Sequence, residues 1–159
     1  MIEIKNLDVI FGPQPELALA LLDADQGREQ IRKDTGLVVG VNNANLTINK
    51  GEICVLMGLS GSGKSSLLRC INGLNDTTRG SINIDHDGGI IDFVNADADT
   101  QREIRMKRIS MVFQKFALMP WLTVAQNVAM PLELQGINKK EIKTRVDAQL
   151  ELVGLKQWA

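Results

Sequence analysis

The stretch at 58–66, with the sequence GLSGSGKSS, constrains this chain more than any other. It matches the pattern G-x-x-x-x-G-K-[ST]. An apolar run at 53–57 precedes it and predicts a strand, and the pattern at 67–71 predicts a helix. Glycines let successive backbone N–H groups point toward one place. The start of a helix adds N–H groups that have no partner within the helix, together with the positive end of the helix dipole, so the loop favours phosphate oxygens. We expect this loop to bind the phosphates of a nucleoside triphosphate. A flexible Gly/Ser loop is the competing interpretation.

The loop predicts separate roles for its side chains. Lys64 is expected to reach the outer phosphates, and the Ser65 hydroxyl is expected to take one position on Mg²⁺. The predicted phosphate-binding residues are Gly58, Ser60, Gly61, Ser62, Gly63, Lys64, Ser65 and Ser66.

Composition narrows the class of protein. A chain of 159 residues suits one domain, and a net charge of −1 implies no general attraction to nucleic acid. No apolar run approaches the roughly 18 residues of a membrane span, and the N-terminus lacks the pattern of a signal peptide. Cys54 and Cys70 lie in apolar patterns, so we expect buried free thiols in a reducing cytoplasm. His86 is the only histidine, which excludes a histidine-based catalytic pair or zinc cluster within the chain.

Apolar periodicity and turn residues predict the order of elements. We expect strands at 2–11, 37–48 (with a bulge at 42–43), 52–57, 81–84, 90–94 and 109–113. Helices are expected at 15–33, 63–72, 98–107, 123–134 and 139–152. The segment 13–36 is interpreted as an insertion between the first two strands.

Two charged clusters have simple interpretations. The acidic residues lack the spacing of a calcium-binding loop, so a solvated turn is favoured, with His86 exposed in it. Glu103 lies among the basic residues, and no aromatic residues alternate with them. A solvated helix face is therefore favoured over a surface that binds nucleic acid. The acidic cluster is Asp85, Asp87, Asp92, Asp97 and Asp99, and the basic one is Arg102, Arg105, Lys107 and Arg108.

Two residues outside the loop are candidates for the same site. Phe11 ends the first strand, where its ring either stacks on a base or belongs to the core. Gln114 follows the predicted strand at 109–113, at the sheet edge where ligands of parallel α/β folds bind. Its amide oxygen could reach Mg²⁺ or an attacking water, although a lone glutamine is usually a surface residue.

The spacing of Phe11, the loop at 58–66, the segment 108–114 (RISMVFQ) and the segment 118–128 (LMPWLTVAQNV) resembles the ATP-binding subunits of ABC transporters. It looks closest to the importer subgroup for glycine betaine, proline and choline. The resemblance implies an α/β P-loop NTPase domain with an antiparallel β subdomain at its N-terminal side.

The resemblance also implies roles and partners. Phe11 would stack on adenine, Lys64 would contact the β- and γ-phosphates, and Ser65 and Gln114 would coordinate Mg²⁺. A second ATP-binding subunit would complete the ATP sandwich. The apolar segment 116–121 would lie near the helical layer that receives the coupling helix of a permease subunit. The permease would hold the protein at the cytoplasmic face of the membrane.

The family pattern continues with a Leu-Ser-Gly-Gly signature, an Asp-Glu pair after a strand and a switch histidine, and these motifs are not found in 1–159. We therefore expect a partial nucleotide-binding domain without its catalytic carboxylate, with exposed sheet edges and poor stability.

Three functions stay open at this point. The first is the ATPase subunit of a quaternary-amine importer. The second is a P-loop kinase or GTPase, for which 138–141 (NKKE) comes close to a guanine-reading motif but is better interpreted as a helix cap. The third is a nucleotide-binding module without catalysis.

Overall fold

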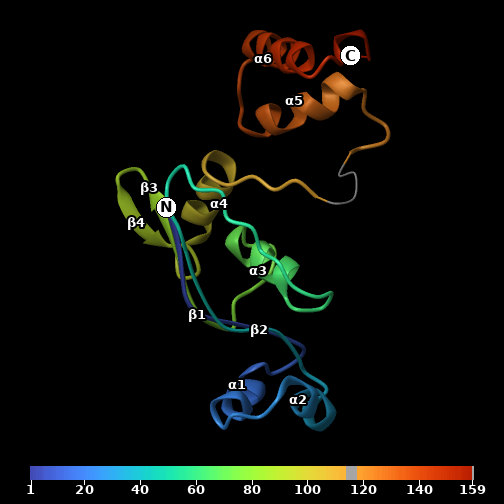
Figure 1. The fold of residues 1–159 in the computed structure, drawn as a ribbon. Coiled ribbons are helices and arrows are strands. Elements are labelled where there is room, and N and C mark those ends of the chain that lie inside the picture. Colours follow the sequence, from blue (N-terminus) through green and yellow to red (C-terminus); the bar gives the residue numbers. More distant parts are fainter. Residues whose placement is uncertain (114–117, 159) are drawn as a thin grey trace. The chain divides into compact units, whose positions relative to one another are not determined.

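The computed structural model describes residues 1–113 and 118–158. The chain forms two compact units, Met1–Ser110 and Met111–Ala159, which are treated separately below (Figure 1).

The first unit is built on a four-stranded antiparallel sheet. Its strands are β1 (Ile2–Phe11), β2 (Val38–Ile48), β3 (Arg79–His86) and β4 (Gly89–Asp92), in the order β2-β1-β3-β4. The β1–β2 pairing shifts register near the expected bulge, where Asn43 has a φ of 47°. Helices α3 (Lys64–Ile71) and α4 (Ala98–Lys107) contribute to the same apolar core as β1 and β3. The expected antiparallel β subdomain is therefore present.

The β3–β4 turn is shorter than expected. His86 pairs with Gly89, so only Asp87 and Gly88 form the turn, with φ values of 49° and 82°. Two consecutive positive φ angles are typical of a type I′ hairpin. Strand β3 thus extends through His86, and alternation places His86 on the buried face with Ile82 and Ile84. The expectation that His86 is exposed was wrong, because the turn begins one residue after it.

The segment between β1 and β2 folds as two helices rather than one. Helix α1 (Glu16–Asp23) ends before Asp25, whose φ is 62°, and α2 (Arg28–Thr35) begins after Gly27. A left-handed residue cannot continue an α-helix, which explains the break. Gly36 ends α2 in the left-handed conformation, as expected. Both helices share a small core with β1 and β2, formed by Ile10, Ala18, Ile31, Leu37 and Val39.

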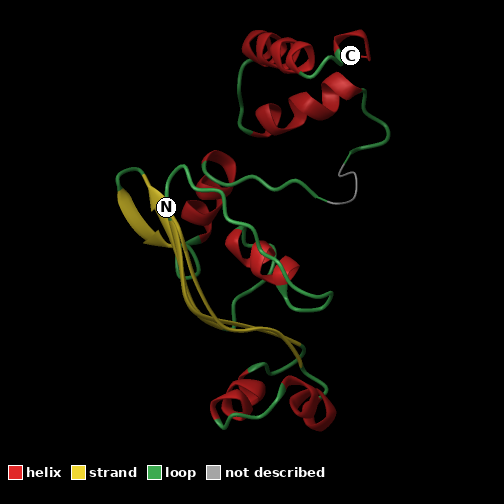
Figure 2. Ribbon diagram, in the orientation of Figure 1, coloured by secondary structure: helices red, strands yellow, loops and turns green. Residues whose placement is uncertain are grey.

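Two strands expected in a parallel sheet are not formed. Residues 52–57 and 109–113 have no strand assignment, and Figure 2 draws the chain between β2 and α3 as loop. Ile53 is 90% exposed and Val112 is 97% exposed. A strand needs a neighbour to satisfy its N–H and C=O groups, and the described strands lie in the antiparallel sheet. Apolar side chains of both segments, such as Ile53 and Val112, are therefore exposed to solvent.

The two cysteines differ in environment. Cys70 on α3 is buried, as expected, and desolvation raises the pKa of its thiol to about 11. Cys54 lies in the unpaired segment and is exposed. The prediction that it is buried was wrong, because it assumed the strand that does not form.

The second unit consists of α5 (Val124–Leu134), α6 (Lys139–Leu152) and the short 3-10 helix η1 (Lys156–Trp158). Thr123 and Gln126 form a capping box at α5, and the Asn138 side chain accepts from the Glu141 N–H at 3.0 Å. Asn138 is thus a helix cap, which favours that interpretation of 138–141 over a guanine reader. Among the residues that the structure describes, no helix has both the length and the apolar character of a membrane span.

Candidate nucleotide-binding site

The phosphate loop connects the unpaired segment to α3. Gly61 and Gly63 have φ values of 79° and 98°, and Gly63 is the N-cap residue of α3. These backbone conformations are open to glycine and strained for other residues. The loop therefore has the glycine-dependent shape that the sequence predicted, at the start of a helix where anions bind.

Lys64 lies over its own loop. Its Nζ donates to the carbonyl oxygens of Gly58 at 2.8 Å and Leu59 at 2.7 Å, and to Ser62 Oγ at 3.2 Å. These three bonds hold the ammonium group against the loop, and helix α3 begins at Lys64 itself. The site thus carries one fixed positive charge beside the positive end of a helix.

A cavity of about 310 Å³ joins the loop to the end of β1. Phe11 lines this cavity together with the strand residues Val38, Val39 and Gly40. The remaining lining residues are Ser60, Gly61, Ser62, Gly63, Lys64, Ser65 and Ser66. Gly58 lines a neighbouring cavity of about 290 Å³, which it shares with Ser62, Gly63 and Lys64. The structure therefore brings Phe11 and the predicted loop residues together.

Gly40 is the residue of this site that the sequence analysis missed. A Cβ atom at Gly40 would lie 2.5 Å from Phe11 Cε2, so the ring packs directly on the strand backbone. Phe11 keeps 40% of its surface exposed, which rules out a fully buried core residue. A glycine inside an expected strand often marks such a close approach, and that was the available signal.

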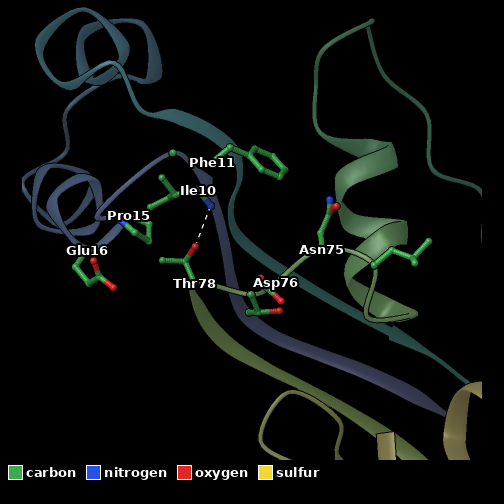
Figure 3. Close-up of a pocket in the computed structure, with 10 residues that line it drawn as sticks. Ile10, Phe11, Pro15, Glu16, Asn75, Asp76 and Thr78 are labelled. Carbon is green, nitrogen blue, oxygen red and sulfur yellow. Dashed lines mark hydrogen bonds between the residues drawn. The ribbon is translucent and has the colours of Figure 1, made fainter. Parts of the chain in front are cut away.

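Phe11 also borders a second cavity, of about 460 Å³, on the side of α1 (Figure 3). Glu16 and Asp76 carry carboxylates there, and Thr78 Oγ1 accepts from the Ile10 N–H at 3.0 Å. Two carboxylates repel phosphate groups, whereas Lys64 and the helix start attract them. Of the two cavities beside Phe11, the one at the loop is therefore suited to a triphosphate.

The loop cavity fits a nucleotide and its metal ion in the chemistry of its lining groups. The cavity combines a backbone whose shape depends on glycines, an ammonium group, four serines in the loop and the first turn of α3, and one exposed aromatic ring. The Ser65 hydroxyl lies in the first turn of α3, where it could face Mg²⁺. Gln114, the other expected Mg²⁺ ligand, and Phe116 lie outside the described residues.

A solved structure has a similar fold. The dimeric structure of a post-hydrolysis state of the ATP-binding cassette MJ0796 bound to ADP and Pi superposes with a TM-score of 0.73. It is 29% identical, and the match covers 100% of this chain and 60% of that one. The α/β cassette fold predicted from the sequence is confirmed.

Curated relatives match over nearly the whole chain. The glycine betaine/proline betaine transport system ATP-binding protein ProV of Escherichia coli (strain K12) is 46% identical over 158 residues. That match covers 99% of this chain and 38% of ProV. The glycine betaine transport ATP-binding protein OpuAA of Bacillus subtilis (strain 168) is 46% identical over 97% of this chain and 36% of its own length. The chain thus spans less than half the length of these relatives. The family model described as ABC transporter matches residues 41–159, and this protein therefore belongs to the ABC transporter family.

Proposed function

We propose that this chain binds MgATP as part of the ATP-binding subunit of an ABC importer, and that the whole subunit couples ATP hydrolysis to uptake of a quaternary amine. The observation that carries the nucleotide site is the single cavity lined by Phe11 and by 60–66. The substrate class rests on the relatives, which are ATP-binding proteins of transport systems for glycine betaine and proline betaine.

In the proposed complex, the triphosphate lies along the loop and adenine stacks on Phe11. Lys64 Nζ leaves the carbonyl oxygens of Gly58 and Leu59 and turns to the β- and γ-phosphates. Ser65 and Gln114 would hold Mg²⁺, which would neutralise charge on the phosphates. The lysine's present bonds are to neutral oxygens, so exchange for phosphate oxygens is electrostatically favourable.

The partners follow from the same proposal. A second ATP-binding subunit and a permease would complete the transporter, with the protein at the cytoplasmic face of the membrane. The solved cassette of similar fold is dimeric. On the second unit, Leu118 and Trp121 are exposed, and the Asn127 side chain donates to the Met119 and Leu122 carbonyls at 3.2 and 3.1 Å. This held apolar segment is the proposed contact for the permease.

Titration with ATP and Mg²⁺ tests the nucleotide site. Phe11→Ala should weaken ATP binding by about 5- to 150-fold, because one aromatic stack contributes about 1–3 kcal/mol. Phe11→Trp should restore binding, and Trp121→Ala, an exposed aromatic residue of the other unit, should leave it unchanged. ATP binding by Phe11→Ala at the parent affinity would contradict the proposed base contact.

A second titration separates this proposal from a GTPase. Stacking on Phe11 hardly distinguishes bases, so ATP and GTP should bind within about tenfold of each other. A strong preference for GTP, lost on Asn138→Ala, would instead support the guanine-reading alternative.

A further inference from the structure

The only histidine of the chain meets two carboxylates away from the nucleotide site. His86 ends β3, Asp87 is the first residue of the β3–β4 turn, and Glu103 lies on α4. The ligand atoms His86 Nε2, one Asp87 oxygen and one Glu103 oxygen all lie within 4.8 Å of one another. None of these residues lines the cavity at the phosphate loop.

His86 is 7% exposed, and its ring is not satisfied by the protein. Nδ1 is buried and has no hydrogen-bond partner. Nε2 faces the carboxylates, 3.5 Å from Asp87 Oδ2 and 4.0 Å from Glu103 Oε2. Both distances are longer than a good hydrogen bond. The imidazole is buried on the core side of the sheet and directs its other nitrogen, Nε2, at two carboxylates without a close hydrogen bond to either.

The second oxygens of both carboxylates are already bound. Arg108 Nη2 donates to Asp87 Oδ1, and Lys107 Nζ donates to Glu103 Oε1. The Arg108 hydrogen bond holds the pKa of Asp87 below its usual value, so that carboxylate stays ionised. The oxygens that face His86 are the ones that these ion pairs leave available. In metal sites, such outer contacts orient the ligands.

We propose that His86, Asp87 and Glu103 form a binding site for a divalent transition-metal ion such as Zn²⁺. One imidazole nitrogen and two carboxylate oxygens match the donor preference of Zn²⁺, with water as a fourth ligand. Ligands about 2.1 Å from a tetrahedral zinc ion lie roughly 3.4 Å apart. The separations of 3.5 and 4.0 Å from His86 Nε2, and of at most 4.8 Å between the two carboxylate oxygens, would have to contract on metal binding, and both carboxylates belong to side chains that are not buried. A single histidine is enough here, because the carboxylates supply the other ligands.

The charges around the proposed metal site limit its affinity for the ion. Asp87 and Glu103 contribute two negative charges, and Arg108 and Lys107 contribute two positive ones at their outer oxygens. We therefore expect binding weaker than that of structural zinc sites with four protein ligands.

Calorimetric titration of the untagged protein with ZnCl₂, without nucleotide, tests the proposal. The exposed thiol of Cys54 also binds zinc, so the measurement uses a Cys54→Ser background. One Zn²⁺ per chain is expected, and His86→Asn, Asp87→Asn and Glu103→Gln should each weaken binding at least tenfold.

Glu151→Gln is the matched control. Glu151 also forms an exposed ion pair with a lysine, Lys156, at 3.1 Å, and lies on α6 in the other unit. The zinc affinity of the Glu151→Gln variant should equal that of the Cys54→Ser protein. Should His86→Asn fail to fold, Asp87→Asn and Glu103→Gln still decide, since they change side chains that are not buried. Unchanged zinc affinity in those two variants, or in folded His86→Asn, would overturn the proposal.

Cobalt provides a second readout. Co²⁺ bound in a low-coordinate site should give a visible absorption band that disappears in Glu103→Gln and persists in Glu151→Gln. A band that persists in Glu103→Gln would also overturn the proposal. Failure of the metal site leaves the proposed ATP site unaffected, because the two sites share no lining residue.

Discussion

Gly63 and Gly40 approach so closely that a Cβ atom on Gly63 would lie 2.1 Å from the Gly40 carbonyl oxygen. The phosphate loop is thereby pressed against β2, the strand on which Phe11 packs. Backbone contact between these two glycines is what brings the phosphate end and the aromatic end of the cavity together.

Gly63→Ala should destabilise the protein by at least about 2 kcal/mol and abolish ATP binding. The new Cβ meets backbone that cannot move cheaply, and the φ of 98° is itself unfavourable for alanine. Gly61→Ala is the matched control, because its φ of 79° is similar but nothing lies within 4 Å of the new Cβ. It should cost about 1 kcal/mol. Urea unfolding measures the stability of both variants. Equal losses of unfolding free energy would show that the contact with Gly40 does not contribute to the cost of Gly63→Ala.

Asp8 and Asp23 both pair with Arg79 but should differ in their effect on stability. Asp8 is 1% exposed and accepts from Arg79 Nε and from the Asn43 N–H, each at 2.7 Å. Asp8→Ala leaves that amide without its partner and should cost about 2–3 kcal/mol. Asp23 is mostly exposed, so Asp23→Ala should cost about 0–1 kcal/mol. Thermal or urea unfolding of the two variants gives the comparison, and a larger loss for Asp23→Ala would contradict the assigned burial.

The two isoleucines Ile82 and Ile53 provide a test of the unpaired segment. Ile82 is buried in the core of the sheet, whereas Ile53 is almost fully exposed. Ile82→Ala should lower the free energy of unfolding by about 2–5 kcal/mol. Ile53→Ala should change it by no more than about 0.5 kcal/mol. A large loss at Ile53 in this 159-residue chain would mean that the segment at 52–57 pairs in solution.

Cys70 makes stability depend on pH in the alkaline range. Burial raises the pKa of its thiol from 9.0 to about 11, so the folded state keeps the proton longer than the unfolded state. The contribution to stability is therefore complete below pH 9 and falls as the pH rises toward 11. Urea unfolding between pH 8 and pH 11 should show this decline, and Cys70→Ala should reduce it.

Thiol labelling gives an independent check of the same environments. At pH 8, Cys54 should react rapidly with a thiol reagent, while Cys70 should react only on unfolding. Rapid modification of both thiols in the folded protein would contradict the burial of Cys70.

Local patterns determined much of this protein. The glycines at 61 and 63 have the positive φ angles that their motif requires, and Thr123 and Asn138 cap the helices that follow them. The first strand and the position of the β2 bulge also agree with the sequence pattern, since apolar alternation marks the strand and the Asn-Asn pair at 42–43 marks the bulge. Within the candidate site, the loop residues and Phe11 could be named before the structure was seen.

Burial and pairing were decided by the tertiary structure, since both depend on residues far apart in sequence. The segments at 52–57 and 109–113 have the sequence pattern of strands, yet neither is a strand in the structure, where the four described strands β1 to β4 pair with one another. Cys54 is exposed because the segment that contains it does not form a strand. His86 is buried because β3 extends as far as this residue. Gly40 matters for the site only because Phe11 folds onto it. A sequence pattern shows which residues favour a strand or a turn, but the neighbour that satisfies a strand's backbone or covers a side chain is supplied by the rest of the fold.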